Sequence, residues 1–347
     1  MKLRRFFLFP FSLLYGFITG IRNYLYDKKF FRSATFDIPV ICIGNLKVGG
    51  TGKTPHVEYV VKTFSTDLGA AVLSRGYGRA SKGYVEVAPT TPAKIAGDEP
   101  AQYRRKFGSN IQVAVCENRV YGIERLTRQF HDLKAVVLDD AMQHRRVRPG
   151  LTIMLTEFNT PFFRDSILPG GWLRENRYGA RRADTIIITK CPPTLSEETK
   201  NEYRKSVTRY SGPKPVFFTR YEYGAPVNLY ETEKFTGDLA HYHVLAVSGI
   251  ANPGPFHTFL RQHCASVETL RFADHYAYTL DDENKITRKF QRLPHDRFRL
   301  ILTTEKDAVK FKDLNLLTSL PVAYIPIETA FLEKENEFRQ LVGDFLN

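Results

Sequence analysis

The 347-residue sequence predicts an α/β fold built on a doubly wound, mostly parallel β-sheet. Three observations indicate this class. Continuous apolar runs, typical of parallel strands buried on both faces, alternate with segments of helical character. A glycine-rich loop follows the first of these runs and precedes a helix, which is the arrangement of a P-loop. The composition, 43% hydrophobic and 25% charged, is that of a globular protein.

Glycine and proline divide the chain into a short helix, two domains and a connection. The clusters Ser211-Gly212-Pro213 and Gly224-Ala225-Pro226 bracket a short extended piece, after which a second α/β pattern begins. A chain of this length can bury a core in each of two domains. We expect an N-terminal membrane-associating helix at 1–33, a P-loop domain at 34–210, a linker or β-ribbon at 211–234 and a smaller α/β domain at 235–347.

The first 33 residues are basic and strongly apolar. They contain seven lysines or arginines against one aspartate, and residues 6–21 carry no charge. No small-residue cleavage site follows this run, which argues against a cleaved signal peptide. A spanning helix needs about 20 apolar residues. This run is shorter and is interrupted by Pro10, Gly16 and Gly20.

We therefore expect a helix that lies in the membrane surface, or dips into it, on the cytoplasmic face. Its Phe, Leu and Ile side chains would enter the acyl boundary, and its basic residues would meet anionic lipid. Tyr15, Tyr24 and Tyr26 would sit at headgroup depth. The alternative is a basic helix docked on the protein itself.

The apolar runs give the expected strands in order. In the first domain these lie at 40–43, 71–73, 111–115, 135–138, 152–155 and 185–188. In the second domain they lie at 244–247, 267–271, 300–303 and 322–325, followed by a closing helix at 331–345. In such an array, ligands bind at the carboxyl ends of the parallel strands.

The loop after the first strand has the composition of a phosphate-binding loop. Residues 44–55 read Gly-Asn-Leu-Lys-Val-Gly-Gly-Thr-Gly-Lys-Thr-Pro and precede a helix at 56–64. The lysine can reach the β/γ-phosphates, the second threonine can ligate Mg²⁺, and the backbone N–H groups can surround phosphate oxygens. Lys47 stands where the general pattern has glycine. The expected nucleotide-binding residues are Gly49, Gly50, Thr51, Gly52, Lys53 and Thr54.

A pair of acids follows a neighbouring strand. The run at 135–138 ends in Asp139 and Asp140. P-loop proteins hold Mg²⁺ with a carboxylate in this position, so we expect one of the two to bind Mg²⁺ together with Thr54. The alternative is a surface pair of acids at a strand end.

Nine motifs in series resemble those of the tetraacyldisaccharide 4'-kinase family, the lipid A kinases of Gram-negative bacteria. Within that family Lys47 is not a departure, whereas Ala141-Met142 and Trp172 are; Trp172 would lie at the rim where acyl chains are bound. The motifs are the loop at 44–55, residues 73–79, Gly97-Asp98-Glu99-Pro100, Asp139-Asp140 with Gln143-His144, Leu173-Arg174-Glu175, Arg182-Ala183-Asp184 with Thr189-Lys190, residues 249–253, Phe272-Ala273-Asp274-His275 and residues 304–310.

This resemblance implies a reaction and a location. The family transfers the ATP γ-phosphate to the 4'-hydroxyl of a tetraacylated glucosamine disaccharide 1-phosphate, which yields the 1,4'-bisphosphate in lipid A biosynthesis. The expected cofactors are ATP and Mg²⁺, and the expected location is the cytoplasmic face of the inner membrane. An amphiphilic acceptor would explain the apolar and basic N-terminus. We expect a monomer that binds no nucleic acid.

The reaction requires a base near the acceptor hydroxyl, besides the charge stabilisation that Lys53 would supply. We expect Asp98 to be that base, with His275 as its partner and Asp274 orienting His275. The alternatives are a helix N-cap role for Asp98 and a loop pair without function for Asp274 and His275.

Further residues of the matching motifs are candidates for binding phosphate or substrate. Arg119 and Arg174 would neutralise transition-state charge or bind the 1-phosphate, and the sequence leaves both roles open. Glu175 would be a further acid near the metal. The remaining candidates are Arg75, Gln143 and His144.

Two other functions compete with this interpretation. Membrane-targeted P-loop switch ATPases use the loop Lys-Gly-Gly-x-Gly-Lys-Thr, but here Val48 occupies the position of the first lysine. A nucleic-acid-binding protein is suggested by the net charge of +13. However, the basic residues concentrate at the apolar N-terminus, and no recognised nucleic-acid-binding motif is present.

Overall fold

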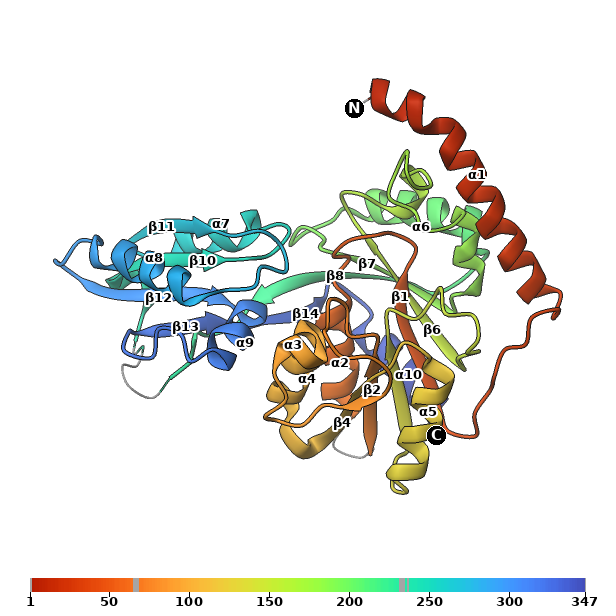
Figure 1. Cartoon of the computed structure of the whole chain (residues 1–347). Coiled ribbons are helices and arrows are strands. Elements are labelled where there is room, and N and C mark those ends of the chain that lie inside the picture. The colour runs from red at the N-terminus through yellow and green to blue at the C-terminus, as the bar shows by residue number, and fades with distance from the viewer. Residues whose placement is uncertain (1, 65–68, 231–234, 236, 347) are drawn as a thin grey trace.

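Two β-sheets organise the chain in the computed structural model (Figure 1), which describes residues 2–64, 69–230, 235 and 237–346. The larger sheet contains β1 (Val40–Asn45), β2 (Ala70–Ser74), β3 (Val85–Glu86), β4 (Ile111–Val115), β5 (Ala135–Asp139), β6 (Leu151–Glu157), β7 (Thr185–Thr189), β8 (Val216–Tyr223) and β14 (Ile327–Phe331). The smaller sheet contains β9 (Val227–Asn228), β10 (Tyr242–Ser248), β11 (Ser266–Arg271), β12 (Phe298–Thr304) and β13 (Val322–Ile325).

Both sheets are mostly parallel, which confirms the predicted fold class. The larger has the order β14-β8-β7-β6-β1-β5-β2-β4-β3, and only its end pairs β14–β8 and β3–β4 are antiparallel. The smaller has the order β11-β10-β12-β13-β9, with β13–β9 antiparallel. The described helices are α1 (Lys2–Asp27), α2 (Lys53–Phe64), α3 (Ala93–Ala96), α4 (Asp98–Phe107), α5 (Arg119–Gln129), α6 (Glu197–Ser211), α7 (Gly254–His263), α8 (Leu280–Gln291), α9 (Glu305–Asp313) and α10 (Glu335–Leu346).

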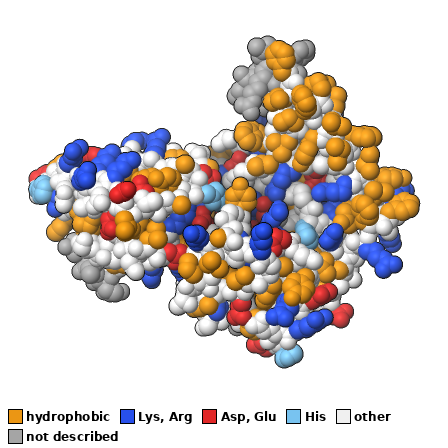
Figure 2. All heavy atoms as spheres, viewed as in Figure 1, with side chains coloured by type: hydrophobic (Ala, Val, Ile, Leu, Met, Phe, Trp, Pro, Cys, Tyr) orange, Lys and Arg blue, Asp and Glu red, His pale blue; other side chains and the backbone are white. Residues whose placement is uncertain are grey.

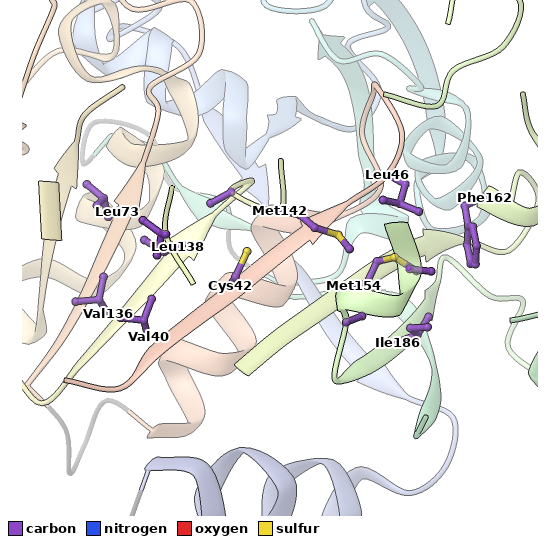
Figure 3. Packing of buried hydrophobic residues seen from close by; sticks show 14 of the residues in the cluster. Val40, Cys42, Leu46, Leu73, Val136, Leu138, Met142, Met154, Phe162 and Ile186 are labelled. Atoms are coloured by element: carbon purple, nitrogen blue, oxygen red, sulfur yellow. The ribbon is translucent and has the colours of Figure 1, made fainter. Parts of the chain in front are cut away.

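Helices cover both faces of the larger sheet, so its central strands are apolar without alternation. Along β1, Val40 and Cys42 join the core cluster that contains residues of α5 and α6 (Figure 3). Ile41 and Ile43 join the opposite cluster, which contains residues of α2, α4 and α10. Each side chain of this strand is therefore buried, which is why a continuous apolar run identified it.

Within the expected linker or β-ribbon at 211–234, the predicted extended piece is a strand of the larger sheet. Residues 216–223 form β8, which pairs in parallel with β7 and antiparallel with β14. Phe217 and Phe218 point into the two opposite cores of the larger sheet. This burial on both faces explains why the segment is a sheet strand. Residues 231–234 lie outside the described part of the chain.

The end of the chain also differs from the expected closing helix at 331–345. Residues 327–331 form β14, and α10 begins only at Glu335. Both elements pack on the larger sheet, because Phe331 and Phe338 contact Phe217 of β8 with ring centroids 6.0 and 5.3 Å apart. The last segment of the expected second domain thus completes the core of the first.

The N-terminal helix α1 has one docked side and one exposed apolar side. On the docked side, Gly170 N–H donates to Ser12 Oγ at 2.9 Å and the Tyr15 hydroxyl donates to the Arg174 carbonyl at 3.1 Å. Arg145 lies over the ring of Tyr26. Tyr15 and Tyr26 therefore contact the protein and not lipid headgroups as expected, because their partners come from neighbouring loops. Tyr24 is 56% exposed.

The opposite side of α1 presents an apolar stripe to solvent (Figure 2). Among the described residues, no helix combines the length and the apolar character needed to cross a bilayer. Pro10 lies inside α1. The exposed apolar residues of the stripe are Phe7, Phe9, Phe11, Leu13, Leu14, Phe17, Ile18 and Ile21.

Replacing Phe338 with alanine is expected to lower the free energy of unfolding by about 3–5 kcal/mol, because a fully buried ring between α10 and the larger sheet is lost. Chemical denaturation followed by circular dichroism measures this change. The control Asp344→Ala, at an exposed position of the same helix, is expected to change it by less than about 0.5 kcal/mol. Equal effects of both substitutions would contradict the packing of α10.

Candidate functional site

The loop between β1 and α2 has the backbone of a phosphate-binding loop. Gly49 and Gly52 adopt φ angles of +109° and +90°, which side chains rarely permit. At Gly52 an added Cβ would also overlap the Tyr221 hydroxyl, which comes from β8. Helix α2 begins at Lys53, so the first N–H groups of the helix face the space above the loop.

Hydrogen bonds from the neighbouring strands fix this loop. Asn45 Nδ2 donates to Thr51 Oγ1 at 2.5 Å, and Thr189 Oγ1 donates to the Thr51 carbonyl at 2.9 Å. His56 Nδ1 lies 2.8 Å from the Gly52 carbonyl, which can only accept, so Nδ1 carries the proton. Burial lowers the pKa of His56 to about 4, so this histidine is neutral at physiological pH.

Lys47 has a structural task that explains its presence in the loop. Its ammonium donates to the Thr160 carbonyl at 2.9 Å and lies 3.5 Å from Asp165 Oδ2. It also forms an antiparallel bridge with Leu173. The first half of the loop is thereby attached to the segment that precedes Arg174.

The acids at the end of β5 lie at the same edge of the sheet as the loop. The β1–β5 pairing places Ile43 opposite Asp139. Lys53 Nζ lies 3.5 Å from Asp140 Oδ2. Asp140 has a φ of +49°, in the left-handed region that non-glycine residues adopt uncommonly.

Asp139 and Asp140 have opposite pKa shifts. Burial raises the pKa of Asp139 to about 7, despite the attraction of Lys53. Burial also acts on Asp140, but Lys53 and Arg174 outweigh it and hold its pKa below the usual value. Among the described residues, no group donates a hydrogen bond to the buried Asp139 Oδ1. An unpartnered carboxylate oxygen at the end of β5 fits the oxygen ligands that Mg²⁺ prefers.

Arg174 contacts both strand ends. Its guanidinium lies 2.7 Å from Asp140 Oδ1 and also binds Asn45 Oδ1. Arg119 is buried at the start of α5, and its guanidinium donates to the Cys116 carbonyl at 3.0 Å. Burial lowers the pKa of Arg119, partly offset by Asp139 and Asp140. Both arginines therefore belong to the carboxylate end of the sheet, as predicted.

His144 and Arg75 lie beside Arg119. The Arg119 N–H donates to His144 Nε2 at 3.3 Å, which leaves that nitrogen unprotonated. Burial lowers the pKa of His144 to about 4, assisted by the charges of Arg119, Arg146 and Arg75. Arg75 is exposed. The exposed Arg75 and Arg146 are the charged groups at this surface, and a positive charge there suits an anionic ligand.

Glu175 and Gln143 join elements instead of pointing into open space. Glu175 has no exposed surface, and it accepts hydrogen bonds from Asn23 of α1 at 2.7 Å and from Arg182 at 2.7 Å. Gln143 Nε2 donates to Glu175 at 2.9 Å and to the Asn45 carbonyl at 2.8 Å. In this arrangement Glu175 holds α1 against the end of β1.

Asp98 and His275 lie side by side, and their contact joins the start of α4 to the loop that follows β11 of the smaller sheet. His275 Nδ1 lies 3.1 Å from Asp98 Oδ2. Asp98 is the first residue of α4, whose N-cap is Gly97, so it is not the N-cap. Asp274 Oδ1 accepts from the His275 N–H at 3.1 Å, and the φ of His275 is +55°.

The start of α4 also approaches the acids of β5. The Glu99 carboxylate contributes to the raised pKa of Asp139, after burial and Asp140. Tyr103, on the same helix, is fully buried, and its pKa is raised well above the usual value by burial and by the Asp139 charge. Helix α4 therefore links Asp98, the candidate base, to Asp139, a candidate Mg²⁺ ligand.

Several residues of this region were not predicted as site residues. Lys306 and Lys310 of α9 contact the Asp98–His275 pair, and Lys190 binds both the Gly50 carbonyl and Glu157. Two features of the sequence could have identified them. The motif at 304–310 contains Lys306 and Lys310, and the pair Thr189-Lys190 belongs to another of the matching motifs. Tyr221 could not be found, because it lies in the segment expected as a linker.

Replacing Gly52 with alanine is expected to abolish binding of a fluorescent ATP analogue, because neither the φ of +90° nor the Tyr221 contact tolerates a Cβ. Fluorescence titration measures the affinity. The control Gly20→Ala, where a Cβ meets nothing within 4 Å, is expected to bind as the unchanged protein does. Unaltered affinity of Gly52→Ala would show that the loop does not hold the nucleotide in this conformation.

Comparison with known proteins confirms the predicted resemblance. Residues 4–347 match the family model described as tetraacyldisaccharide-1-P 4'-kinase. The tetraacyldisaccharide 4'-kinase of Flavobacterium johnsoniae is 41% identical over 338 residues, which cover 97% of this chain and 96% of the relative. That of Cytophaga hutchinsonii is 42% identical over 342 residues, with 96% and 94% covered.

A solved structure supports the same conclusion. The crystal structure of LpxK from Aquifex aeolicus in complex with ATP has a TM-score of 0.76 and 28% sequence identity, and the match covers 99% of each chain. The family model and the curated relatives each cover nearly the whole chain. The chain therefore belongs to the tetraacyldisaccharide 4'-kinase family, the ATP-dependent kinases of lipid A biosynthesis.

Proposed function

We propose that this kinase phosphorylates its glycolipid at the region where the P-loop, the acids of β5 and the Asp98–His275 pair meet. The acceptor is the 4'-hydroxyl of a tetraacylated glucosamine disaccharide 1-phosphate. The observation that carries the assignment is the 3.1 Å contact of His275 Nδ1 with Asp98 Oδ2. Glu99, which follows Asp98 on α4, carries a charge that raises the pKa of Asp139. This supports a proton acceptor on the helix that faces the acids of β5.

On the nucleotide side, Lys53 and the N–H groups of the loop stabilise the β- and γ-phosphate oxygens. Thr54, Asp139 and Asp140 would hold Mg²⁺, which when bound neutralises phosphate charge. Arg174 keeps Asp140 ionised and lies where it can attract negative charge.

On the acceptor side, the 4'-oxygen forms the new bond to phosphorus as its proton leaves to the Asp98–His275 pair. The bond from the γ-phosphorus to the bridging oxygen breaks, and ADP departs. A carboxylate joined to an imidazole can accept a proton near neutral pH. Asp274 accepts the backbone N–H of His275 and so holds the loop that presents this ring.

The lipid would bind beside α1. A hollow of about 320 Å³ lies between α1 and residues 143–146, and its lining includes Arg22, Arg145, Arg146 and Asn118. These groups suit sugar hydroxyls and a phosphate. The apolar stripe belongs to the same helix, at residues that precede Arg22, and it would accommodate acyl chains at the surface of the inner membrane.

Purified protein with Mg-ATP and a monophosphorylated lipid A disaccharide is expected to form the bisphosphorylated product. Asp98→Ala and His275→Ala are each expected to lower turnover on the order of 10²–10⁴-fold, because proton transfer is lost. The matched control is Asp296→Ala, which breaks the contact of an exposed aspartate with the buried His243 at 2.9 Å. Near-normal turnover of both site variants would refute the assigned base.

Membrane binding is expected to depend on the apolar stripe of α1. Changing Phe9, Phe11 and Phe17 to serine is expected to lower sedimentation with vesicles containing anionic phospholipid by about hundredfold in partition coefficient or more, because three rings no longer enter the acyl boundary.

The matched control for the stripe is the double change Leu280→Ser and Phe298→Ser. These two residues are as exposed as those of the stripe. Leu280 begins α8 and Phe298 begins β12 of the smaller sheet, so vesicle binding is expected to stay unchanged. Binding that falls equally in both variants would show that exposed apolar surface in general, and not α1, holds the protein to lipid.

A further inference from the structure

Helix α9 brings an ammonium group directly onto the proposed base. Lys310 Nζ lies 3.0 Å from Asp98 Oδ2, the same oxygen that His275 Nδ1 approaches at 3.1 Å. The Lys310 side chain is only 9% exposed, and its ammonium also donates to the Tyr276 carbonyl at 3.1 Å. A buried, doubly held ammonium at this distance acts as a fixed charge.

A second lysine of the same helix faces the other side of the pair. Lys306 Nζ lies 3.2 Å from His275 Nε2, 3.5 Å from Asp274 Oδ1, 3.7 Å from Glu99 Oε1 and 3.9 Å from Asp98 Oδ2. Its side chain is more exposed, at 19%. From the loop after β2, the Tyr77 ring contacts His275 with centroids 5.4 Å apart.

The position of Lys310 is fixed by the start of α9. The Thr304 hydroxyl caps this helix by accepting the Asp307 N–H. The buried Asp307 accepts the Gly249 N–H at 2.9 Å and the Tyr278 hydroxyl at 3.1 Å. Lys106 of α4 binds Glu305 of α9 at 3.1 Å. These contacts hold α9 both to the smaller sheet and to the helix that bears Asp98.

We propose that Lys310 is a positioning residue for phosphoryl transfer: it fixes Asp98 Oδ2 and, through its charge, keeps the Asp98–His275 pair able to accept a proton at neutral pH. The inference rests on the proposed function, in which this pair receives the proton of the 4'-hydroxyl. Lys306 contributes the same effect more weakly from the His275 side. The smaller sheet thus supplies the charge that adjusts a base on the larger one.

The charges around Asp98 support this role. Burial favours the protonated carboxyl, but the His275 hydrogen bond and the Lys310 and Lys306 ammonium groups outweigh it, so the pKa of Asp98 lies below its usual value. Glu99 and Asp274 have the opposite sign, and Lys306 lies within 3.7 Å of both. Lys310 lies 3.0 Å from Asp98 Oδ2 and Lys306 lies 3.9 Å from it, so Lys310 is the nearer of the two cations.

Removal of this cation has a predictable sign. Without Lys310, protonation of the pair no longer opposes a neighbouring positive charge, so the apparent pKa of the pair rises. The base is then lost at a higher pH as the solution is acidified, and the acid limb of the rate profile moves upward. Because the two groups titrate together, the shift belongs to the pair and not to either residue.

The test is the pH dependence of kcat/KM for the monophosphorylated disaccharide at saturating Mg-ATP, in mixed micelles. Lys310→Met is expected to move the acid limb upward by about one pH unit or more. Lys310→Arg keeps the charge and is expected to keep the limb of the unchanged enzyme. The control Lys312→Met removes an exposed lysine from the same helix and is expected to leave the profile unchanged.

A lower rate of Lys310→Met with an unshifted limb would overturn the proposal, since that result describes a merely structural residue. If Lys310→Met does not fold, Lys306→Met tests the effect of positive charge on the same pair. We then expect a smaller upward shift of the acid limb of the pH profile. An unshifted acid limb would again overturn the proposal. Asp98→Ala separates the two hypotheses. If Asp98→Ala keeps the activity of the unchanged enzyme, the proposed base is refuted. If Asp98→Ala loses activity but the lysine variants show no shift of the acid limb, the proposed role of the lysines is refuted.

Discussion

Parallel pairing of β1 with β5 is the constraint on which the site depends. Because the two strands run in the same direction and Ile43 lies opposite Asp139, the loop after one strand and the acids after the other must emerge side by side. β2 and β4 extend the same edge and add Ser74 and the start of α5. The polar groups are adjacent because the sheet is parallel, although they are distant along the chain.

Opposite charges then organise this edge. Lys53 and Arg174 both approach Asp140, while the neighbouring Asp139 keeps a buried oxygen without a donor among the described residues. A cationic ligand at that oxygen would replace the solvation lost on burial. Left-handed backbone at Asp140, Lys190 and His275 is found in the same region, where the surrounding packing maintains it.

Local patterns predicted the central strands and, with them, the strand ends at which the candidate site residues lie. Apolar runs bounded by turn residues marked β1, β4 and β5 to within two residues, because burial on both faces leaves a continuous signal. The extended character of β8 was predicted, but its place in the larger sheet was not, because its flanking glycines and prolines are also those of a linker and its partner β14 is distant in sequence. Similarly, the contacts of Lys310 with Asp98 and of Tyr221 with Gly52 depend on tertiary packing, which periodicity does not encode.

The buried carboxylate of Glu175 has a consequence for how the enzyme meets its acceptor. It binds Asn23 of α1, Gln143 and Arg182 at once, so the amphipathic helix cannot rotate freely with respect to the β1 edge. If the enzyme binds a bilayer through this helix, its active site would lie at a fixed height above the membrane and at a fixed tilt. Encounters would then become a two-dimensional search, in which the glycolipid diffuses laterally to the active site and never leaves the leaflet.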